Sequence, residues 1–260
     1  GAIDEAQGYT NSCEYLWTVP NIATTMAKVR VRDNSDPDYV KDESDNNFKI
    51  MGRVIVTRPN GSEVWYAGAS ENIEWTKYGP ASFDTVKIDY SINDPAFANP
   101  QSITTATPND NSYTWVNIPP EAVSGQLRIR VAKPDDADVF DISDGDFRVR
   151  ATFTLNAPDG GQKWVVGNQE TISWTQVGAT NGVKFIYYKQ SNPGNQGFFN
   201  LSGNYGSGSH SYGWVIPNFI NDDLIMRVED PNDNGAYDIS NAVFKIMPGF
   251  TVTSPDQNSK

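Results

Sequence analysis

Short runs in which apolar and polar residues alternate recur along the chain, and this period of two predicts β-strands. Residues 126–132, with the sequence QLRIRVA, show the alternation best, because Leu127, Ile129 and Val131 would face one side of a sheet. Stretches rich in Pro, Asn, Asp and Gly separate these runs, and no segment has the period of an amphipathic helix. The pattern predicts an all-β protein.

One stretch of the chain holds seven such runs in succession. We expect strands at Arg53–Arg58, Asn72–Thr76, Thr85–Ser91, Gln101–Thr105, Ser112–Val116, Gln126–Ala132 and Asp146–Ala151. Seven short strands in about a hundred residues are typical of a two-sheet β-sandwich of the immunoglobulin type. The disulfide that joins the sheets of antibody domains is absent, and we expect an inward Trp75 or Trp174 to fill its space.

The sequence repeats itself at intervals of 97 to 99 residues. A Trp before a Pro recurs at positions 17, 115 and 214, a closing Phe at 48, 147 and 244, and a Pro at 59, 158 and 255. The repeats predict four segments: residues 1–51, the C-terminal half of a unit (the first piece); 52–150 (the second unit) and 151–248 (the third unit), both complete; and 249–260, the first strand of a further unit. The fold prediction is therefore a rod-like array of tandem immunoglobulin-like sandwiches, because almost no linker separates the units.

The two incomplete segments lack the middle of a repeat, so together they do not make a whole unit, which argues against circular permutation. Their pattern leads us to expect that the chain is part of a longer repeated protein. The alternative is that the end strand at residues 249–260 pairs with another copy by strand addition.

The order of motifs within a unit resembles a known family. A "VTSP" element, a Trp before Gly, then "IxWT", "YxWxxP", an Arg-bearing strand and a closing "F+[IV]" follow one another at fixed spacing. This order resembles the immunoglobulin-like repeat of fungal Ser/Thr-rich, GPI-anchored cell-wall synthesis proteins and related bacterial surface-protein repeats. The resemblance covers nearly the whole chain and implies noncatalytic modules of extracellular, cell-wall or surface-layer proteins. The chain departs from that family in lacking a long Ser/Thr-rich stalk and an anchor signal.

Composition and charge narrow the function classes. The net charge of −12 argues against a nucleic-acid partner, because binding to phosphate backbones requires clustered Lys and Arg. No apolar run approaches the roughly 18 residues of a membrane span. The single cysteine, Cys13, excludes an internal disulfide and leaves two readings, a buried thiol or an intermolecular disulfide.

The chain offers little for catalysis. The one histidine, His210, lies in the Gly/Ser-rich stretch GSGSHSYGW, where we expect an exposed turn residue. Cys13 has no evident basic partner that would activate a thiol. We therefore predict that the protein is not an enzyme.

The acidic loops after the Arg-bearing strands are candidates for Ca²⁺, the one cofactor we consider. In the third unit the loop has the D-x-N-x-N-G spacing of the first half of a calcium loop, although Asn241 replaces the expected Glu. The candidate metal ligands are Asp230, Asn232, Asn234 and Asp238 in the third unit and Asn34, Asp36, Asp38 and Asp42 in the first piece. In the second unit Lys133 takes the first position and would oppose a cation. The alternative is a solvated acidic turn without an ion.

A hairpin with no counterpart in the other units offers a second candidate site. The stretch SNPGNQGFFNLSGNYGSGSH is rich in Gly, Asn and Ser, and it can present aromatic rings to a sugar or a neighbouring subunit. The candidate ligand or interface residues are Tyr188, Phe198, Phe199 and Tyr205. The alternative is that part of the hairpin is strand core, because Phe199 and Leu201 alternate.

Together these features predict a non-catalytic extracellular structural protein at the cell surface or in the cell wall, part of a surface layer, sheath, filament or adhesive stalk. Its expected partners are copies of itself, other cell-surface proteins and glycans. The alternative function is a carbohydrate-binding accessory region of a secreted enzyme or cell-wall assembly factor.

Overall fold

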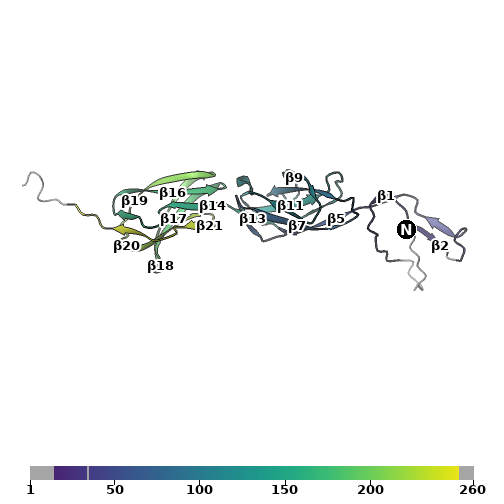
Figure 1. Ribbon diagram of the computed structural model, residues 1–260, viewed down its shortest axis with the longest axis horizontal. Helices are drawn as coiled ribbons and strands as arrows, with labels where there is room; N and C mark the ends of the chain where they lie inside the picture. Colours follow the sequence, from purple (N-terminus) through teal and green to yellow (C-terminus); the bar gives the residue numbers. More distant parts are fainter. Residues whose placement is uncertain (1–14, 34, 252–260) are drawn as a thin grey trace, which may run out of the picture.

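The computed structural model describes residues 15–33 and 35–251, and their regular secondary structure is almost wholly β-strand (Figure 1). The first piece contains β1 (Thr24–Ala27), β2 (Arg30–Arg32), β3 (Lys41–Glu43) and β4 (Phe48–Ile50). The second unit contains β5 (Arg53–Arg58), β6 (Val64–Tyr66), β7 (Glu71–Tyr78), β8 (Thr85–Ile92), β9 (Gln101–Pro108), β10 (Ser112–Trp115), the short 3-10 helix η1 (Pro120–Ala122), β11 (Ser124–Ala132), β12 (Phe140–Ile142) and β13 (Phe147–Arg150). The third unit contains β14 (Thr152–Ala157), β15 (Lys163–Val165), β16 (Gln169–Val177), β17 (Thr180–Lys189), β18 (Asn192–Tyr205), β19 (Gly208–Val215), β20 (Asn221–Asp230), β21 (Asp233–Ile239) and β22 (Phe244–Met247).

Both complete units are two-sheet sandwiches with the same topology. In the second unit one sheet has the order β10-β7-β5 and the other β6-β13-β11-β8-β9, with β12 also paired to β11. In the third unit the orders are β14-β16-β19 and β15-β22-β20-β17-β18, with β21 paired to β20. In each unit the first strand leaves one sheet at a Pro, and the chain then pairs in parallel with the last strand of the other sheet. This is an immunoglobulin-like arrangement, so the predicted all-β fold class is confirmed.

All seven strands expected in the second unit are present at the expected places, with ends that differ by up to three residues. Two short strands were missed, β6 and β12. Each contains only three residues, which is too short for a period of two to stand out.

Tryptophans form the centre of each core, as expected. Trp65, Trp75 and Trp174 are at most 2% exposed. The indole N–H of Trp75 donates to Asn109 Oδ1 at 2.7 Å, and that of Trp174 donates to Gln176 Oε1 at 3.1 Å. Each core therefore contains a buried tryptophan whose N–H is satisfied, in a sandwich without an internal disulfide, since the chain has one cysteine.

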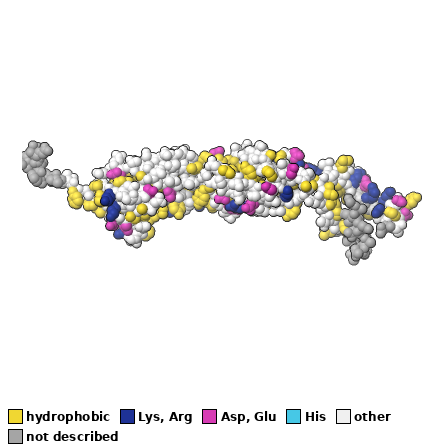
Figure 2. All heavy atoms as spheres, in the orientation of Figure 1, with side chains coloured by type: hydrophobic (Ala, Val, Ile, Leu, Met, Phe, Trp, Pro, Cys, Tyr) yellow, Lys and Arg dark blue, Asp and Glu magenta, His cyan; other side chains and the backbone are white. Residues whose placement is uncertain are grey.

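The first piece lacks this two-layer packing. Its strands form two separate pairs, β1 with β4 and β2 with β3. Val31 in β2 is 71% exposed, whereas Val131 at the same place in β11 is fully buried. Figure 2 shows hydrophobic side chains on the surface of this end of the molecule. The reason is that no second sheet covers β2 within the described residues.

An Asp-x-Ser motif fastens the two sheets of each complete unit. Asp141 Oδ2 accepts a hydrogen bond from the Val56 N–H at 2.8 Å, and Asp238 Oδ2 accepts one from the Leu155 N–H at 2.7 Å. Both N–H groups belong to edge strands, whose outward-facing backbone groups need a partner. Two residues on, Ser143 and Ser240 each accept an N–H from the preceding long strand at 3.2 Å. We call this arrangement the aspartate clamp.

Removing the aspartate clamp destabilises a unit. Asp238→Ala leaves the Leu155 N–H without its partner, and we expect the free energy of unfolding of the third unit to fall by about 1–3 kcal/mol. Asp42 lies at the same place in the first piece but is exposed, so Asp42→Ala is the control and changes stability by at most about 0.5 kcal/mol. Equilibrium unfolding in urea measures both, and equal effects of the two substitutions would contradict the clamp.

Candidate functional site at the joints between units

Ala151 is the whole connection between the second and third units. β13 ends at Arg150 and β14 begins at Thr152, and Ala151 is 2% exposed and part of the core of the third unit. The Thr152 hydroxyl donates to the Ala67 carbonyl at 2.7 Å, and the Ala67 N–H donates to the Arg150 carbonyl at 2.9 Å. Both flanks of the connection are therefore bonded to the second unit, which restricts the backbone rotations that a hinge requires.

Apolar side chains seal the same joint. Val123 of the second unit packs against the cores of both units, and Val177 of the third unit packs against the core of the second. Gly178 follows with a φ of +95°, and a Cβ on it would stand 2.4 Å from Val123 Cγ2. This glycine is required both by its left-handed backbone and by the close approach of the neighbouring unit.

Charged side chains complete the joint. Asp233 Oδ2 accepts hydrogen bonds from Arg150 Nε at 2.9 Å and from Arg148 Nη1 at 3.2 Å. The Asp233 and Arg150 side chains are 19% and 21% exposed, so solvent screens their interaction only in part. A Cβ on Gly235 would stand 2.2 Å from Arg150 Cζ, so the glycine leaves room for the guanidinium.

The ion pair shifts the ionisation of both partners. Burial opposes the charge on Asp233, but hydrogen bonds from Arg150 and from the Gly235 N–H outweigh it and hold the pKa of the carboxyl below its usual value. The hydrogen bond to Asp233 in turn raises the pKa of Arg150. The pair therefore stays charged at neutral pH.

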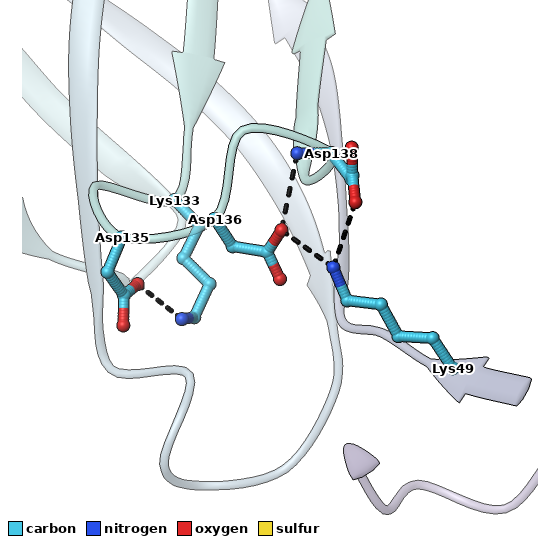
Figure 3. Close-up of polar contacts among 5 residues, drawn as sticks. All are labelled: Lys49, Lys133, Asp135, Asp136 and Asp138. Atoms are coloured by element: carbon cyan, nitrogen blue, oxygen red, sulfur yellow. Dashed lines mark hydrogen bonds and ion pairs between the residues drawn. The ribbon is translucent and has the colours of Figure 1, made fainter. Parts of the chain in front are cut away.

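The joint between the first piece and the second unit repeats this ion pair with other residues. Lys49 Nζ lies 2.9 Å from Asp136 Oδ1 and 3.0 Å from Asp138 Oδ2 (Figure 3). Its hydrogen bonds to these two carboxylates raise the pKa of Lys49, and its hydrogen bond to Asp136 lowers the pKa of that acid.

The two joints place corresponding residues together. Lys49 and Arg148 each follow the closing Phe of their unit, while Asp136 and Asp233 each stand five residues before the clamping aspartate of the next unit. Lys133, expected to oppose a cation, pairs with Asp135 within its own loop.

The structure gives protein partners to most of the predicted calcium ligands of the third unit. Asp230 Oδ1 accepts from the Asn232 N–H, the Asn232 amide donates to the Asn181 carbonyl, the Asn234 carbonyl accepts from Arg227, and Asp238 is the clamp residue. Burial raises the pKa of Asp230. Among the described residues, no three His, Cys, Asp or Glu side chains form a group suited to a metal ion.

Of the first-piece ligands, Asp36 and Asp38 lie in the turn between β2 and β3, Asp42 lies in β3 itself opposite Val31, and Asn34 lies outside the described residues. Calcium binding stays a prediction for both loops.

The four aromatic candidates do not share one surface. Phe198 is 63% exposed on the outer face of its sheet, with Lys184 Nζ 5.6 Å from the ring centroid, and Tyr188 is half-buried on the same face. Phe199 faces inward and stacks on Phe185 at 5.2 Å, and Tyr205 packs on Trp174 at 5.7 Å. A ligand surface therefore stays a prediction for the first two, whereas the last two pack against the core.

His210 is not an exposed turn residue as expected. It lies in β19 opposite Trp174, half-buried, with its ring 5.3 Å from that of Trp174 and 5.4 Å from that of Tyr205. The turn was expected from the Gly and Ser around it, but pairing with β16 overrides that local preference. Cys13 and residues 252–260, on which two further expectations rest, lie outside the described residues.

Sequence reasoning missed the joint residues. The available signal was the cation that follows each closing Phe: Lys49, Arg148 and Lys245. Asp233, the acidic partner, lies within the stretch that was interpreted as a calcium loop. It is 85 residues from Arg148 in the sequence, so nothing local links the two.

Comparisons with known proteins add little. No family model matches the chain, and no curated protein matches it. Among solved structures it is similar to fibronectin(III)-like modules of CbhA from Clostridium thermocellum, with 16% identity and a TM-score of 0.25 over 75% of this chain and 93% of that one. It is also similar to the polymeric Ig receptor ectodomain of a teleost fish, with 9% identity and a TM-score of 0.30 over 76% of this chain and 100% of that one. The strand topology of the two complete units defines the immunoglobulin-like fold.

The ion pair at the joint gives the protein a defined dependence on pH. Because the folded pKa of Asp233 is below its unfolded value of about 3.9, its stabilisation is present above that pH and is lost as pH falls through the folded pKa. Asp233→Asn should lower the free energy of unfolding at pH 7 by about 0.5–1 kcal/mol, and the difference from wild type should shrink as the pH falls through the folded pKa of Asp233. Calorimetry across this range tests it. Asp222→Asn, the same change at an exposed site, is the control, and a pH-independent effect of Asp233→Asn would contradict the assignment.

Proposed function

We propose that the protein is a non-catalytic structural protein of the cell surface, in which immunoglobulin-like units are fixed end to end as a stiff rod. The observation that carries this proposal is the sealed joint, in which a single buried residue connects two sandwiches and an arginine pair binds the acid of the next unit. The Lys49–Asp136 ion pair at the first joint supports the view that this kind of contact recurs at successive joints. A rod of this kind extends reach or builds a layer, sheath or filament.

The chemistry of the described residues supports a role without catalysis. His210 contacts two aromatic rings and hydrogen-bonds to the Gly206 carbonyl, and within the described parts of the chain it has no hydrogen bond or ion pair with a carboxylate or a nucleophile. Catalysis by general acid and base requires such a partner within hydrogen-bond reach.

The fold also suits the proposed location. Many cell-surface domains share the sandwich architecture. No helix in the described part of the chain is long and apolar enough to cross a membrane. We propose an extracellular location at the cell surface or cell wall.

Opening the joint tests the rod. Gly178→Ala drives a Cβ into Val123, so we expect the two units to hinge while each stays folded. Gly167→Ala is a matched control, because Gly167 also has a positive φ, +85°, but has no neighbour within 4 Å of its Cβ position. Small-angle X-ray scattering of the full chain measures the outcome. We expect wild type and Gly167→Ala to give the same narrow distance distribution and Gly178→Ala a broader one; a broad distribution for wild type would refute the rod.

A second candidate function, sugar recognition, is favoured by the exposed ring of Phe198 beside Tyr188 on an open sheet face. Under this alternative, glycan binding is lost in Phe198→Ala. Phe140→Ala is the control, because Phe140 is 50% exposed on β12 of the second unit. A glycan array with all three proteins decides the matter, and the absence of binding by wild type would leave the structural function alone.

A further inference from the structure

A run of 32 residues without a single charged side chain, 190–221, extends from the end of β17 to the start of β20. The whole chain is 20% charged, so this run departs strongly from the rest of the protein. The run contains β18 and β19, which are the edge strands of the two sheets of the third unit. These two strands therefore carry no charge of their own, although Lys184 of β17 lies beside Phe198, and in Figure 2 the surface over β16 and β19 is mostly white.

The two neutral strands lie side by side. Phe199 of β18 contacts Tyr212 of β19 at 5.6 Å and Trp214 of β19 at 5.5 Å between ring centroids. Their outward side chains include exposed apolar groups, with Phe198 63% and Val215 62% exposed. We call the two uncharged strands β18 and β19, within residues 190–221, the neutral edge.

The middle of β18 lacks the devices that usually protect an edge strand. Six consecutive residues, Gln196–Leu201, pair with β17 without a shift in register. Pro193 precedes this segment and Gly203, with a φ of +118°, follows it, so neither interrupts it. Lysines, prolines and bulges normally prevent edge strands from pairing with other chains, and this segment has none of them.

The opposite edge of the third unit is not available in the same way. β14 has no charged residue either, but β21 lies against it, and the Asp238 carboxylate takes the Leu155 N–H. The second unit repeats the neutral side, since Asp110 is the single charge among residues 95–120, which include β9 and β10.

We propose that the neutral edge is a lateral docking surface for a second copy of this chain, with β18 pairing antiparallel to β18 of that copy. Two chains of charge −12 repel each other, so close approach is favoured where both surfaces are neutral. A two-fold arrangement places the same strand on both sides and joins the two sheets into one. It also brings the exposed Phe198 of each copy to the same face of the joined sheet, where an aromatic pair across the two strands would stabilise the dimer. This inference rests on the proposed structural function, to which it adds the partner.

Salt distinguishes this pairing from one made by ion pairs. Because the neutral edge contains no charges, salt should screen the repulsion between the two chains and strengthen the dimer. Association through opposite charges would weaken under the same conditions.

Asn200→Asp tests the strand pairing. Asn200 is exposed on the segment Gln196–Leu201, opposite Lys184, whose ammonium group already pairs with Glu229. In a two-fold pair the substitution therefore adds two like charges at one interface. Asn156→Asp is the matched control, the same change at an exposed position of β14. Sedimentation velocity of the full chain, in reducing buffer so that Cys13 forms no crosslink, gives the dissociation constant of the dimer at low and high salt. Equal melting temperatures show that the variants are folded.

We expect a reversible wild-type dimer that tightens with salt, an unchanged Asn156→Asp, and an Asn200→Asp dissociation constant raised about tenfold or more. A wild-type protein that stays monomeric, or equal effects of the two substitutions, would overturn the inference. Scattering from the monomer separates this result from the proposed function: a rigid monomer that fails to dimerise refutes only the lateral pairing, and a hinged monomer that dimerises through β18 refutes only the rod.

Discussion

The connection through a single buried residue, Ala151, is the constraint on which the rest of the structure depends. With no free linker, the end of one sandwich must lie against the start of the next, and the groups brought together there must be compatible. Val123 and Val177 fill the apolar part of the contact, Gly178 permits the close approach, and Asp233 binds Arg148 and Arg150 at the rim. Surface ion pairs contribute little stability by themselves, so the pairs set orientation and the apolar contacts supply most of the attraction.

Charge is distributed according to these contacts. Acidic side chains are placed where a cation of the preceding unit reaches them, at Asp136, Asp138 and Asp233. Charges are nearly absent from the side of each unit that exposes strand edges, in particular residues 190–221. A strongly acidic chain can therefore have two kinds of association surface, one polar along the chain and one neutral across it.

The sequence predicted the fold well because the fold depends on local signals. Alternation in QLRIRV, turn residues between strands and the recurrence of Trp, Phe and Pro were enough to place every long strand of the second unit. Strands of three residues were missed, since so short a run shows no period. The position of His210 was wrong because Gly and Ser flank it, while pairing with Trp174 across the sheet decides its conformation.

The candidate site was predictable only in part, because its contacts join residues far apart in the chain. The acidic loops were recognised in the sequence, but the roles of their residues were not. Asp238 accepts the Leu155 N–H and Asp233 binds Arg150, and both contacts depend on which strands become neighbours in the fold. The four aromatic candidates do not form one surface, because neighbouring residues of a strand face opposite sides of the sheet. Phe198 faces outward and Phe199 inward. The cation that recurs after the closing Phe was the one sequence feature that indicated the joint. Its role could not be predicted, because it depends on which acidic loop lies next to it in the folded chain.

A joint sealed in this way should make the second and third units move as one rigid body. Residual dipolar couplings of backbone N–H groups in the weakly aligned full chain measure this directly, since they report the orientation of each unit in a common frame. We expect β5–β13 and β14–β22 to share one alignment tensor, with couplings that fit the structure of both units together. Two tensors of different magnitude or orientation would contradict it.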